Sequence, residues 1–423
     1  MYISKVNGFN TPPQSAARNT IFNLIGCLAY QGCQWLVTIL VVYIAGFEAS
    51  GYLAFAMAIG NVFLPLATFN LRTFQVSDVS DKYSHGCYFA FRVRMILFAL
   101  VATCVYSLIT VKDISFVPSI LAYLLFKIDE SVCDVLSGVD QRFQRMDYIG
   151  VSQFLRGVLL LAGFSIGAYV SGNVTYGIIG MWLPCFLMTV FYDIPHVRRL
   201  TDLDINIHRR EFVDVFKSCL PLAISALMFS MATTIARQLF GNTYGAEQLG
   251  IYASIATPAI LIQAASRYLY APLLTPLALA YRDGYSKLKT AFCRYTSRLV
   301  SATVFIGLVL LFFAPQLLNL LFGPSVSKLA NVFDFMLFAT FLNAFINYLS
   351  DFLVVCEDYR TPLFASIISL AACCLFVYPF ESFIGMNGIN VTLLVSYGCS
   401  VLFLVFKVIR RFAILKCTQT EDY

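Results

Sequence analysis

The sequence predicts an all-α polytopic membrane protein, and three observations carry this prediction. Of the 423 residues, 59% are hydrophobic and only 12% are charged, about half the charged share of a soluble domain. The mean hydropathy is +0.76. The apolar residues come in runs of about 20, which is the length that crosses a bilayer as a helix. This composition excludes a soluble enzyme, a disordered chain and a nucleic-acid-binding module.

Twelve transmembrane helices are expected from these runs. They are predicted near 20–45, 51–73, 92–111, 115–137, 148–171, 175–195, 216–240, 250–275, 295–314, 331–354, 362–383 and 389–409. Connections after odd-numbered spans are mostly very short, whereas those after even-numbered spans are longer and basic. No connection is long enough for a soluble domain. We therefore expect an N-terminal six-helix lobe (1–196), a connector (197–215), a C-terminal six-helix lobe (216–411) and a tail (412–423).

Basic residues predict the orientation of the chain. One set of connecting segments carries many arginines, such as Arg92, Arg145 and Arg199, whereas the opposite loops carry Lys112 and Lys328. Basic segments stay cytoplasmic because their translocation is costly. Both termini are expected in the cytoplasm. The same bias accounts for the net charge of +6, with anionic membrane lipids as its partner.

Neither a metal site nor a cofactor is expected. The 13 cysteines include no CxxC pair and lie almost entirely in apolar runs, where cysteine behaves as a small hydrophobic residue. The three histidines lie far apart in the chain, and no zinc or haem spacing occurs. No Walker-type glycine-rich loop is present, which argues against direct use of ATP.

The two halves of the chain show a weak internal repeat. Gly51-Tyr52-Leu53-Ala54 opens the second span, and Gly250-Ile251-Tyr252-Ala253 opens the eighth. Chance similarity between apolar segments is the alternative explanation. A parallel repeat of two six-helix lobes would place a substrate path between the halves.

Charged residues inside spans are candidates for function, because burying a charge in a bilayer is costly. They are Arg72, Lys127, Arg156, Arg237 and Arg267. Several lie on polar helix faces at 100° per residue; span eight, for example, places Gln263, Ser266 and Arg267 together. Such faces avoid lipid and are expected to point into the bundle.

Span four is the richest in polar residues. Lys127, Glu130, Asp134 and Gln141 share one of its faces. These residues line a hydrophilic cavity in one interpretation and hold helices together through neutralised pairs in the other, since Lys127 and Glu130 are spaced to pair.

Arg156, Arg237 and Arg267 have no carboxylate on the same helix face, which favours a role in a cavity. Arg72 either joins them or extends to the cytoplasmic surface. The planar donors of a guanidinium match phosphate or carboxylate oxygens. A phosphate-bearing substrate is therefore the leading hypothesis.

Two motifs resemble a known family. Spans four and five read Asp134-x3-Gly138-x2-Gln141-x3-Arg145-Met146-Asp147-x-Ile149-x2-Ser152-x3-Arg156-Gly157, and span two ends Asn70-Leu71-Arg72-Thr73-Phe74-Gln75-Val76-Ser77-Asp78. Over roughly the first 160 residues, the chain resembles bacterial Wzx-type polysaccharide flippases. These belong to the multidrug/oligosaccharidyl-lipid/polysaccharide exporter (MOP) superfamily. Arg72, Asp134, Gln141, Arg145 and Arg156 carry the match, and the remainder agrees in span count and loop pattern.

The resemblance implies a MATE-like fold, with two six-helix lobes in a V around a central cationic cavity. It implies alternating-access transfer of an undecaprenyl-pyrophosphate-linked oligosaccharide across the bacterial cytoplasmic membrane for capsule or O-antigen lipopolysaccharide synthesis. Polysaccharide polymerase components are further candidate partners. The expected substrate-binding residues are Arg72, Lys127, Asp134, Gln141, Arg156, Arg237 and Arg267.

Two other functions are weighed against this one. An ion-coupled drug or metabolite antiporter of the same fold would use an acidic site, for which Asp134 and Glu130 are candidates. A membrane-embedded polymerase or glycosyltransferase needs a catalytic constellation, and the sequence shows neither a nucleophile–base pair nor a large extramembrane loop. The chain is therefore expected to be a transporter and not an enzyme.

Overall fold

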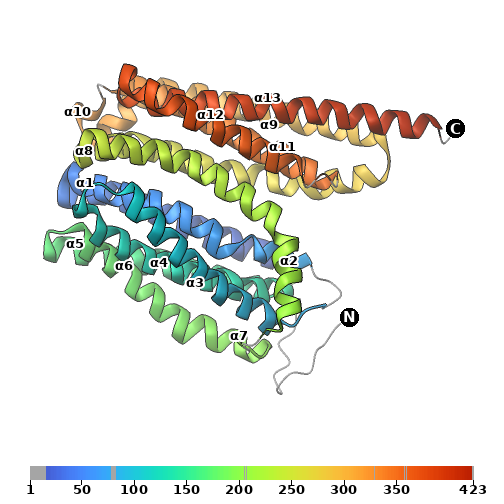
Figure 1. Ribbon diagram of the computed structural model, residues 1–423, viewed down its shortest axis with the longest axis horizontal. Coiled ribbons are helices and arrows are strands. Elements are labelled where there is room, and N and C mark those ends of the chain that lie inside the picture. The colour runs from blue at the N-terminus through green and yellow to red at the C-terminus, as the bar shows by residue number, and fades with distance from the viewer. Residues whose placement is uncertain are drawn as a thin grey trace. The chain divides into compact units, whose positions relative to one another are not determined.

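A computed structural model describes residues 16–77, 82–203, 205, 207–327, 329–356, 358 and 360–421. Within these residues the chain is helical and contains no strand (Figure 1). The helices are α1 (Ala16–Thr68), α2 (Leu71–Ser77), α3 (His85–Thr110), η1 (Ile114–Phe116), α4 (Val117–Arg142), α5 (Met146–Ser171), α6 (Val174–Met188), η2 (Thr189–Asp193), α7 (Ile194–Leu200), α8 (Arg209–Arg282), α9 (Tyr285–Phe322), α10 (Pro324–Ser327), α11 (Ala330–Val355), α12 (Thr361–Ile384) and α13 (Met386–Glu421).

Two long helices each contain a sharp backbone break. In α1 it falls at Gly46, with φ 83° and ψ −179°, and in α8 at Gly245, with φ 87° and ψ 172°. Only glycine adopts such angles without steric cost. Each long helix therefore supplies two spans, and α6, η2 and α7 continue as one. Helices cover all twelve predicted positions within the described residues, which confirms the predicted fold class.

Hydropathy alone identifies fewer spans. By length and composition, nine helices in the described part of the chain can cross a membrane, including the broken segments Ile21–Thr68 and Arg209–Ala256. Helix α4 does not qualify, because Lys127, Asp129 and Glu130 lie in its middle. Many residues of α4, including the charged Lys127 and Asp129, are nonetheless buried.

The predicted repeat positions meet one another in space. A Cβ atom on Gly51 would lie 1.8 Å from the Ala246 carbonyl oxygen, and one on Gly250 would lie 1.8 Å from the Phe47 carbonyl oxygen. The two glycines thus make reciprocal backbone contacts beside the two breaks. This equivalence supports the repeat read from the sequence.

The second predicted span ends earlier than expected. Helix α1 stops at Thr68, and Phe69 and Asn70 take positive φ angles of 49° and 51°. The chain then starts the short helix α2. Left-handed backbone at two successive residues cannot continue a right-handed helix. Arg72 consequently lies in the first turn of α2 and not at the inner end of a long span.

The chain divides into two compact units. Unit 1 comprises the residues up to Ser230 together with Gly241–Gly250, and unit 2 comprises Met231–Phe240 and the residues from Ile251 onward. The predicted lobe boundary at 216 stays a prediction, because α8 contributes to both units.

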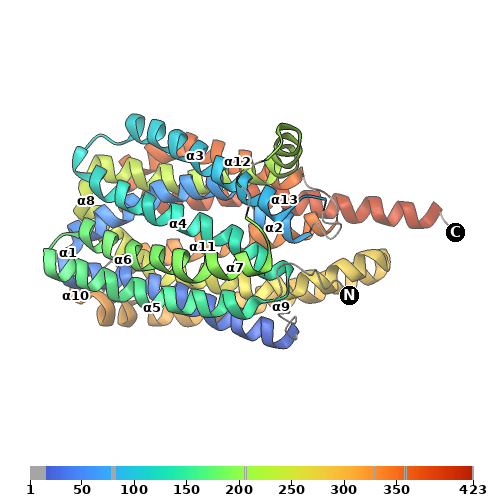
Figure 2. The same cartoon turned by 90° about the horizontal axis from the view of Figure 1, so that it is seen from below.

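Each unit is a helix bundle with its own core. In unit 1, α1 packs against α3, α4 and α5, and α4, α5 and α6 run side by side (Figure 2). In unit 2, α13 packs against α9, α11 and α12 (Figure 1). One core cluster of unit 1 joins Tyr88 and Phe91 of α3 to Val135 of α4 and to Val215 and Cys219 of α8.

Candidate functional site

The first group of predicted site residues meets between α2, α3 and α4. The Arg72 Nε and Nη2 atoms donate hydrogen bonds to the Gln141 amide oxygen at 3.2 and 3.0 Å. Arg72 Nη1 lies 3.6 Å from the Asp134 carboxylate. A fourth residue, Arg92, donates from Nη2 to Asp134 at 2.8 Å. We call Arg72, Arg92, Asp134 and Gln141 the Arg72 cluster.

Arg92 corrects a sequence expectation. It was expected in a basic cytoplasmic segment at the start of span three, but its side chain is 0% exposed. Helix α3 begins at His85, where the Ser84 hydroxyl caps it by accepting the Cys87 N–H at 3.1 Å. Arg92 therefore lies about two turns inside the helix. The capping serine and the aromatic residues before Arg92 were the signal that could have revealed this.

Lys127 forms the pair expected from its spacing. Its ammonium group lies 2.5 Å from Glu130, and Glu130 also accepts from the Tyr30 hydroxyl at 2.5 Å and from the Gln34 amide at 2.9 Å. The Tyr123 ring lies under the ammonium group at 5.2 Å. Glu130 thus ties α4 to α1 and neutralises Lys127. This geometry supports the interpretation of the pair as a link between helices.

Arg156 occupies a third polar cluster, made by α4, α5 and η2. Its side chain is 1% exposed, with Nη1 2.7 Å from Asp129 and Nη2 2.7 Å from Asp193. Its Nε donates to Ser152 at 3.2 Å, and Thr189 is a further partner. We call these five residues the Arg156 cluster. As expected, no carboxylate on the same helix face pairs with Arg156; both of its carboxylate partners come from neighbouring helices.

A π-helical turn places two members of the Arg156 cluster. Over η2, the Ile194 N–H bonds to the Thr189 carbonyl oxygen, five residues back. Pro195, which follows directly, has no N–H to continue the regular ladder. Such single π turns occur frequently at functional sites. Here the turn holds Thr189 and Asp193 toward Arg156 from one side.

Further ion contacts lie near the ends of α4, α5 and α7. The buried His196 ring is 3.2 Å from Asp140 and lies against Tyr148, with ring centroids 3.4 Å apart and ring planes tilted by 32°. In the connection between α4 and α5, Arg145 donates two hydrogen bonds to Asp147, at 3.0 and 3.1 Å. Partial burial lowers the pKa of Arg145, but the hydrogen bonds and charge of Asp147 outweigh it, so this pKa stands above its usual value.

The remaining predicted residues belong to unit 2. Arg237 and the buried Glu381 lie near Tyr252. The Tyr252 hydroxyl donates to Asn390 at 2.9 Å. Arg267 lies in α8, but its side chain is outside the described residues. Arg237 thus belongs to unit 2, whereas the three charged clusters belong to unit 1.

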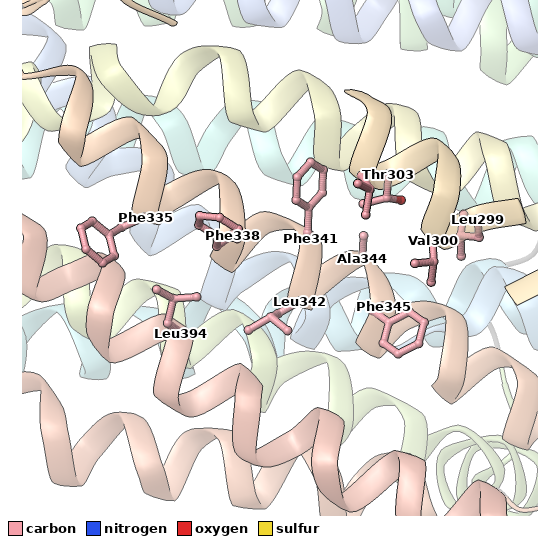
Figure 3. A pocket seen from close by; sticks show the side chains of 11 residues that line it. Leu299, Val300, Thr303, Phe335, Phe338, Phe341, Leu342, Ala344, Phe345 and Leu394 are labelled. Atoms are coloured by element: carbon pink, nitrogen blue, oxygen red, sulfur yellow. The ribbon is translucent and has the colours of Figure 1, made fainter. Parts of the chain in front are cut away.

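Unit 2 also contains an apolar groove of about 410 Å³ between α9, α11 and α13. Figure 3 shows phenylalanines of α11 lining it, among them Phe335, Phe338 and Phe341, with Leu394 of α13 beside them. Thr303 is the polar side chain among its lining residues. The groove offers no charge to a phosphate or sugar, so it is not a site for a polar head group.

Among the described residues, no group of three or more His, Cys, Asp or Glu side chains is arranged to hold a metal ion. The described cysteines are free thiols.

Comparison with known proteins establishes the fold. No protein-family model matches the chain. An inward-facing structure of a multidrug resistance MATE family transporter of the MOP superfamily superposes with a TM-score of 0.70 and 15% identity, over 96% of this chain and 100% of that chain. The Vibrio cholerae MATE transporter VcmN gives 0.64 and 16%, over 95% and 96% of the two chains.

One relative of curated function was found by sequence. The capsular polysaccharide biosynthesis protein CapF of Staphylococcus aureus is 23% identical over 302 residues, which span 70% of this chain and 74% of the relative. The chain thus has the fold of MOP-superfamily transporters and is a multi-pass membrane protein. The resemblance drawn from the motifs of spans two, four and five is confirmed at this level.

Proposed function

We propose that the protein moves polyprenyl-pyrophosphate-linked oligosaccharide repeat units across the bacterial cytoplasmic membrane by alternating access. The observation that carries the proposal is the Arg72 cluster, in which two guanidinium groups share one carboxylate. A partly exposed cation in a membrane bundle suits an anionic head group that cannot cross hydrocarbon unaided. The transporter fold and the role of the relative CapF in capsular polysaccharide biosynthesis support the same function.

The head group contacts polar side chains of the bundle. In this proposal Arg72, held beside Asp134 and Gln141, is its contact in unit 1, whereas Lys127 is neutralised by Glu130. Arg237 and Arg267 of unit 2 stay predicted contacts. Arg156 has a different role, because its donors are already bonded to Asp129, Asp193, Ser152 and Thr189. We assign it to holding α4, α5 and η2 in place.

The product serves surface polysaccharide synthesis, and capsule is the class that CapF favours over O-antigen lipopolysaccharide. The protein acts as a carrier without a cofactor or an enzymatic step, and it delivers its substrate to polymerase components on the far side. Both termini lie in the cytoplasm, as the distribution of basic residues indicates.

An ion-coupled small-molecule antiporter is the second candidate, and one observation favours it. The Arg156 cluster holds two carboxylates against one guanidinium, all three of which are less than 10% exposed. An excess buried carboxylate suits a proton or a small cation. Sodium- or proton-dependent efflux of small organic cations from proteoliposomes would support this candidate.

The test of the proposal uses cells that lack this gene and are blocked only at this step. Polyprenyl-linked glycans are extracted after spheroplasts have been treated with a membrane-impermeant glycan-modifying reagent. We expect complete repeat units to stay unmodified, and so inside, until the gene is restored. Complete units that are modified equally with and without the gene would contradict the proposal and leave the antiporter as the function to test.

A further inference from the structure

The Arg72 cluster contains two cations of very different exposure. The Arg92 side chain is 0% exposed, whereas the side chains of Arg72 and Asp134 are 31% and 28% exposed. The helix of Arg92, α3, contributes the buried Tyr88 and Phe91 to the core cluster that also contains Val135 of α4. A buried guanidinium requires a paired counter-charge. Asp134, at 2.8 Å, supplies it.

The contacts of Arg72 are of another kind. Its short hydrogen bonds, at 3.0 and 3.2 Å, go to the uncharged amide oxygen of Gln141. Its distance to Asp134 is 3.6 Å, compared with 2.8 Å for Arg92. Asp134 is therefore committed chiefly to Arg92, and the positive charge in excess resides on exposed Arg72. Gln141 orients the guanidinium without neutralising it.

Several donors at this position have no partner in the described part of the chain. Nε and Nη1 of Arg92 make no hydrogen bond, and neither does the amide of Gln75. Gln75 is 1% exposed and follows Arg72 by one turn on α2. Its amide oxygen lies against α4, where a Cβ on Gly138 would be 2.2 Å away. Buried donors without partners are rare and call for an explanation.

In the function proposed above, Arg72 takes the phosphate or pyrophosphate group of a lipid-linked substrate. We propose that Arg92 is a positioning residue for this contact: it holds the Asp134 carboxylate away from Arg72, so that the charge of Arg72 is left uncompensated for the anion. The assignment of a lipid-linked substrate rests on the function proposed above. A guanidinium oriented by a neutral amide retains donors for the paired oxygens of a phosphate.

The balance of charges among Arg72, Arg92 and Asp134 predicts how anion binding should change when Arg92 is replaced. If Arg92 is replaced by methionine, Asp134 loses its main partner and neutralises Arg72 instead. An anion should then bind poorly even though Arg72 is intact. The double variant Arg92→Met/Asp134→Asn removes both charges of the pair formed by Arg92 and Asp134. Arg72 is then again a cation without a nearby counter-charge. Binding should return in the double variant.

The experiment measures binding of inorganic pyrophosphate to the full-length protein in lipid nanodiscs by titration calorimetry. Arg72→Met and Arg92→Met should each weaken binding by roughly tenfold to a hundredfold, the range for a hydrogen bond to a charged group. The affinity of the double variant for pyrophosphate should lie within about threefold of the wild-type affinity, well below the loss expected for either single variant. Lys287→Met, which removes an exposed cation from unit 2, should leave binding unchanged.

A melting curve for each variant separates loss of binding from loss of fold. Wild-type binding in a folded Arg92→Met protein, or weak binding in a folded double variant, would overturn the proposal. A fall in binding with Lys287→Met equal to that with Arg72→Met would overturn it too, since nonspecific charge would then explain the result.

Two further arms identify the source of the phosphate. Nanodiscs containing polyprenyl pyrophosphate should compete with inorganic pyrophosphate, whereas phosphatidylglycerol at the same mole fraction should not. Equal competition by phosphatidylglycerol would overturn the substrate assignment. If the leaflet test above fails while the binding pattern holds, the site stands and the flippase function falls. If export is restored but Arg72→Met binds pyrophosphate normally, the function stands and the site falls.

Discussion

Two long helices share a backbone device, but the two units differ in what they bury. Gly46 and Gly245 break α1 and α8 with nearly the same dihedral angles. Unit 1 holds the ion pairs of Arg92, Lys127 and Arg156 inside its bundle. In the described part of unit 2, the ion pair between Lys287 and Asp283 lies on the exposed surface.

Neutral groups make several of the interior contacts described in unit 2. The Tyr252 hydroxyl bonds to Asn390, Ser369 bonds to Ser396, and Ser400 donates to the Ala365 carbonyl oxygen. Hydroxyl and amide groups hold helices together in membranes without the desolvation cost of ions. The comparison teaches that buried ion pairs link helices in unit 1, whereas hydroxyl and amide groups link several helices of unit 2. This difference is the reason that we place the proposed anion site in unit 1.

The largest expected effect comes from Arg156→Met. It leaves Asp129 and Asp193 buried without their shared cation, and breaking a buried ion pair costs about 3–5 kcal/mol. We expect a sharp fall in folded protein and in melting temperature, measured by fluorescence-detected size exclusion.

Arg411→Met in unit 2 is the matched control. The Arg411 guanidinium donates to the neutral Cys356 carbonyl and the Tyr281 hydroxyl. Its removal leaves no buried carboxylate without a partner. The free energy of unfolding should therefore fall by less, about 1.5–3 kcal/mol. Equal losses for the two variants would contradict the difference drawn between the units.

Arg72→Met should come next, acting on transport and not on folding. The side chain is partly exposed, and its short hydrogen bonds go to one neutral residue. We expect export in a complementation assay to fall roughly tenfold to a hundredfold, with normal protein yield. Arg237→Met in unit 2 should have a lesser effect. A greater loss of export with Arg237→Met than with Arg72→Met would indicate that the main anion contact lies in unit 2.

Substitutions at the two backbone breaks should have equal, intermediate effects on stability. Gly46→Ala and Gly245→Ala each force a side chain into left-handed backbone, which costs about 1–2 kcal/mol. Neither added Cβ would meet another atom within 4 Å, so strain alone is tested. Melting temperatures that differ clearly between the two variants would show that the breaks are not equivalent.

Tyr252→Phe should give the smallest effect. It removes the hydroxyl that donates to Asn390 at 2.9 Å and leaves the ring in place. A neutral hydrogen bond contributes about 1 kcal/mol net, and the melting temperature should fall slightly with export unchanged. Complete loss of export would show that unit 2 depends on this hydroxyl for transport.

Predictions from the sequence succeeded where the determinant was local. The spans follow from runs of apolar residues, and the pairing of Lys127 with Glu130 follows from their spacing on one helix. The bent entry into α2 was missed, because nothing in Phe69 demands a positive φ. The partners of Arg156 were missed because Asp129 and Asp193 reach it from other helices, which a search along one helix face does not find.

Arg92 shows the same limit from another side. Its position beside Arg94, at the expected start of span three, suggested the cytoplasmic surface, but the helix begins about two turns earlier and Arg92 lies in the core. Long-range packing decides whether such a residue is exposed or buried. The pairing of Arg72 with Gln141 also depends on packing, although both residues were identified as site residues from the sequence.

The most direct test of the central claim is transport by the purified protein. Proteoliposomes carrying a fluorescent polyprenyl-pyrophosphate oligosaccharide in the inner leaflet would be followed by an impermeant quencher. The account predicts that wild-type protein exposes the label, that Arg411→Met retains most of this activity, and that Arg72→Met loses nearly all of it. Equal exposure with wild-type protein, with Arg72→Met and with empty vesicles would contradict it.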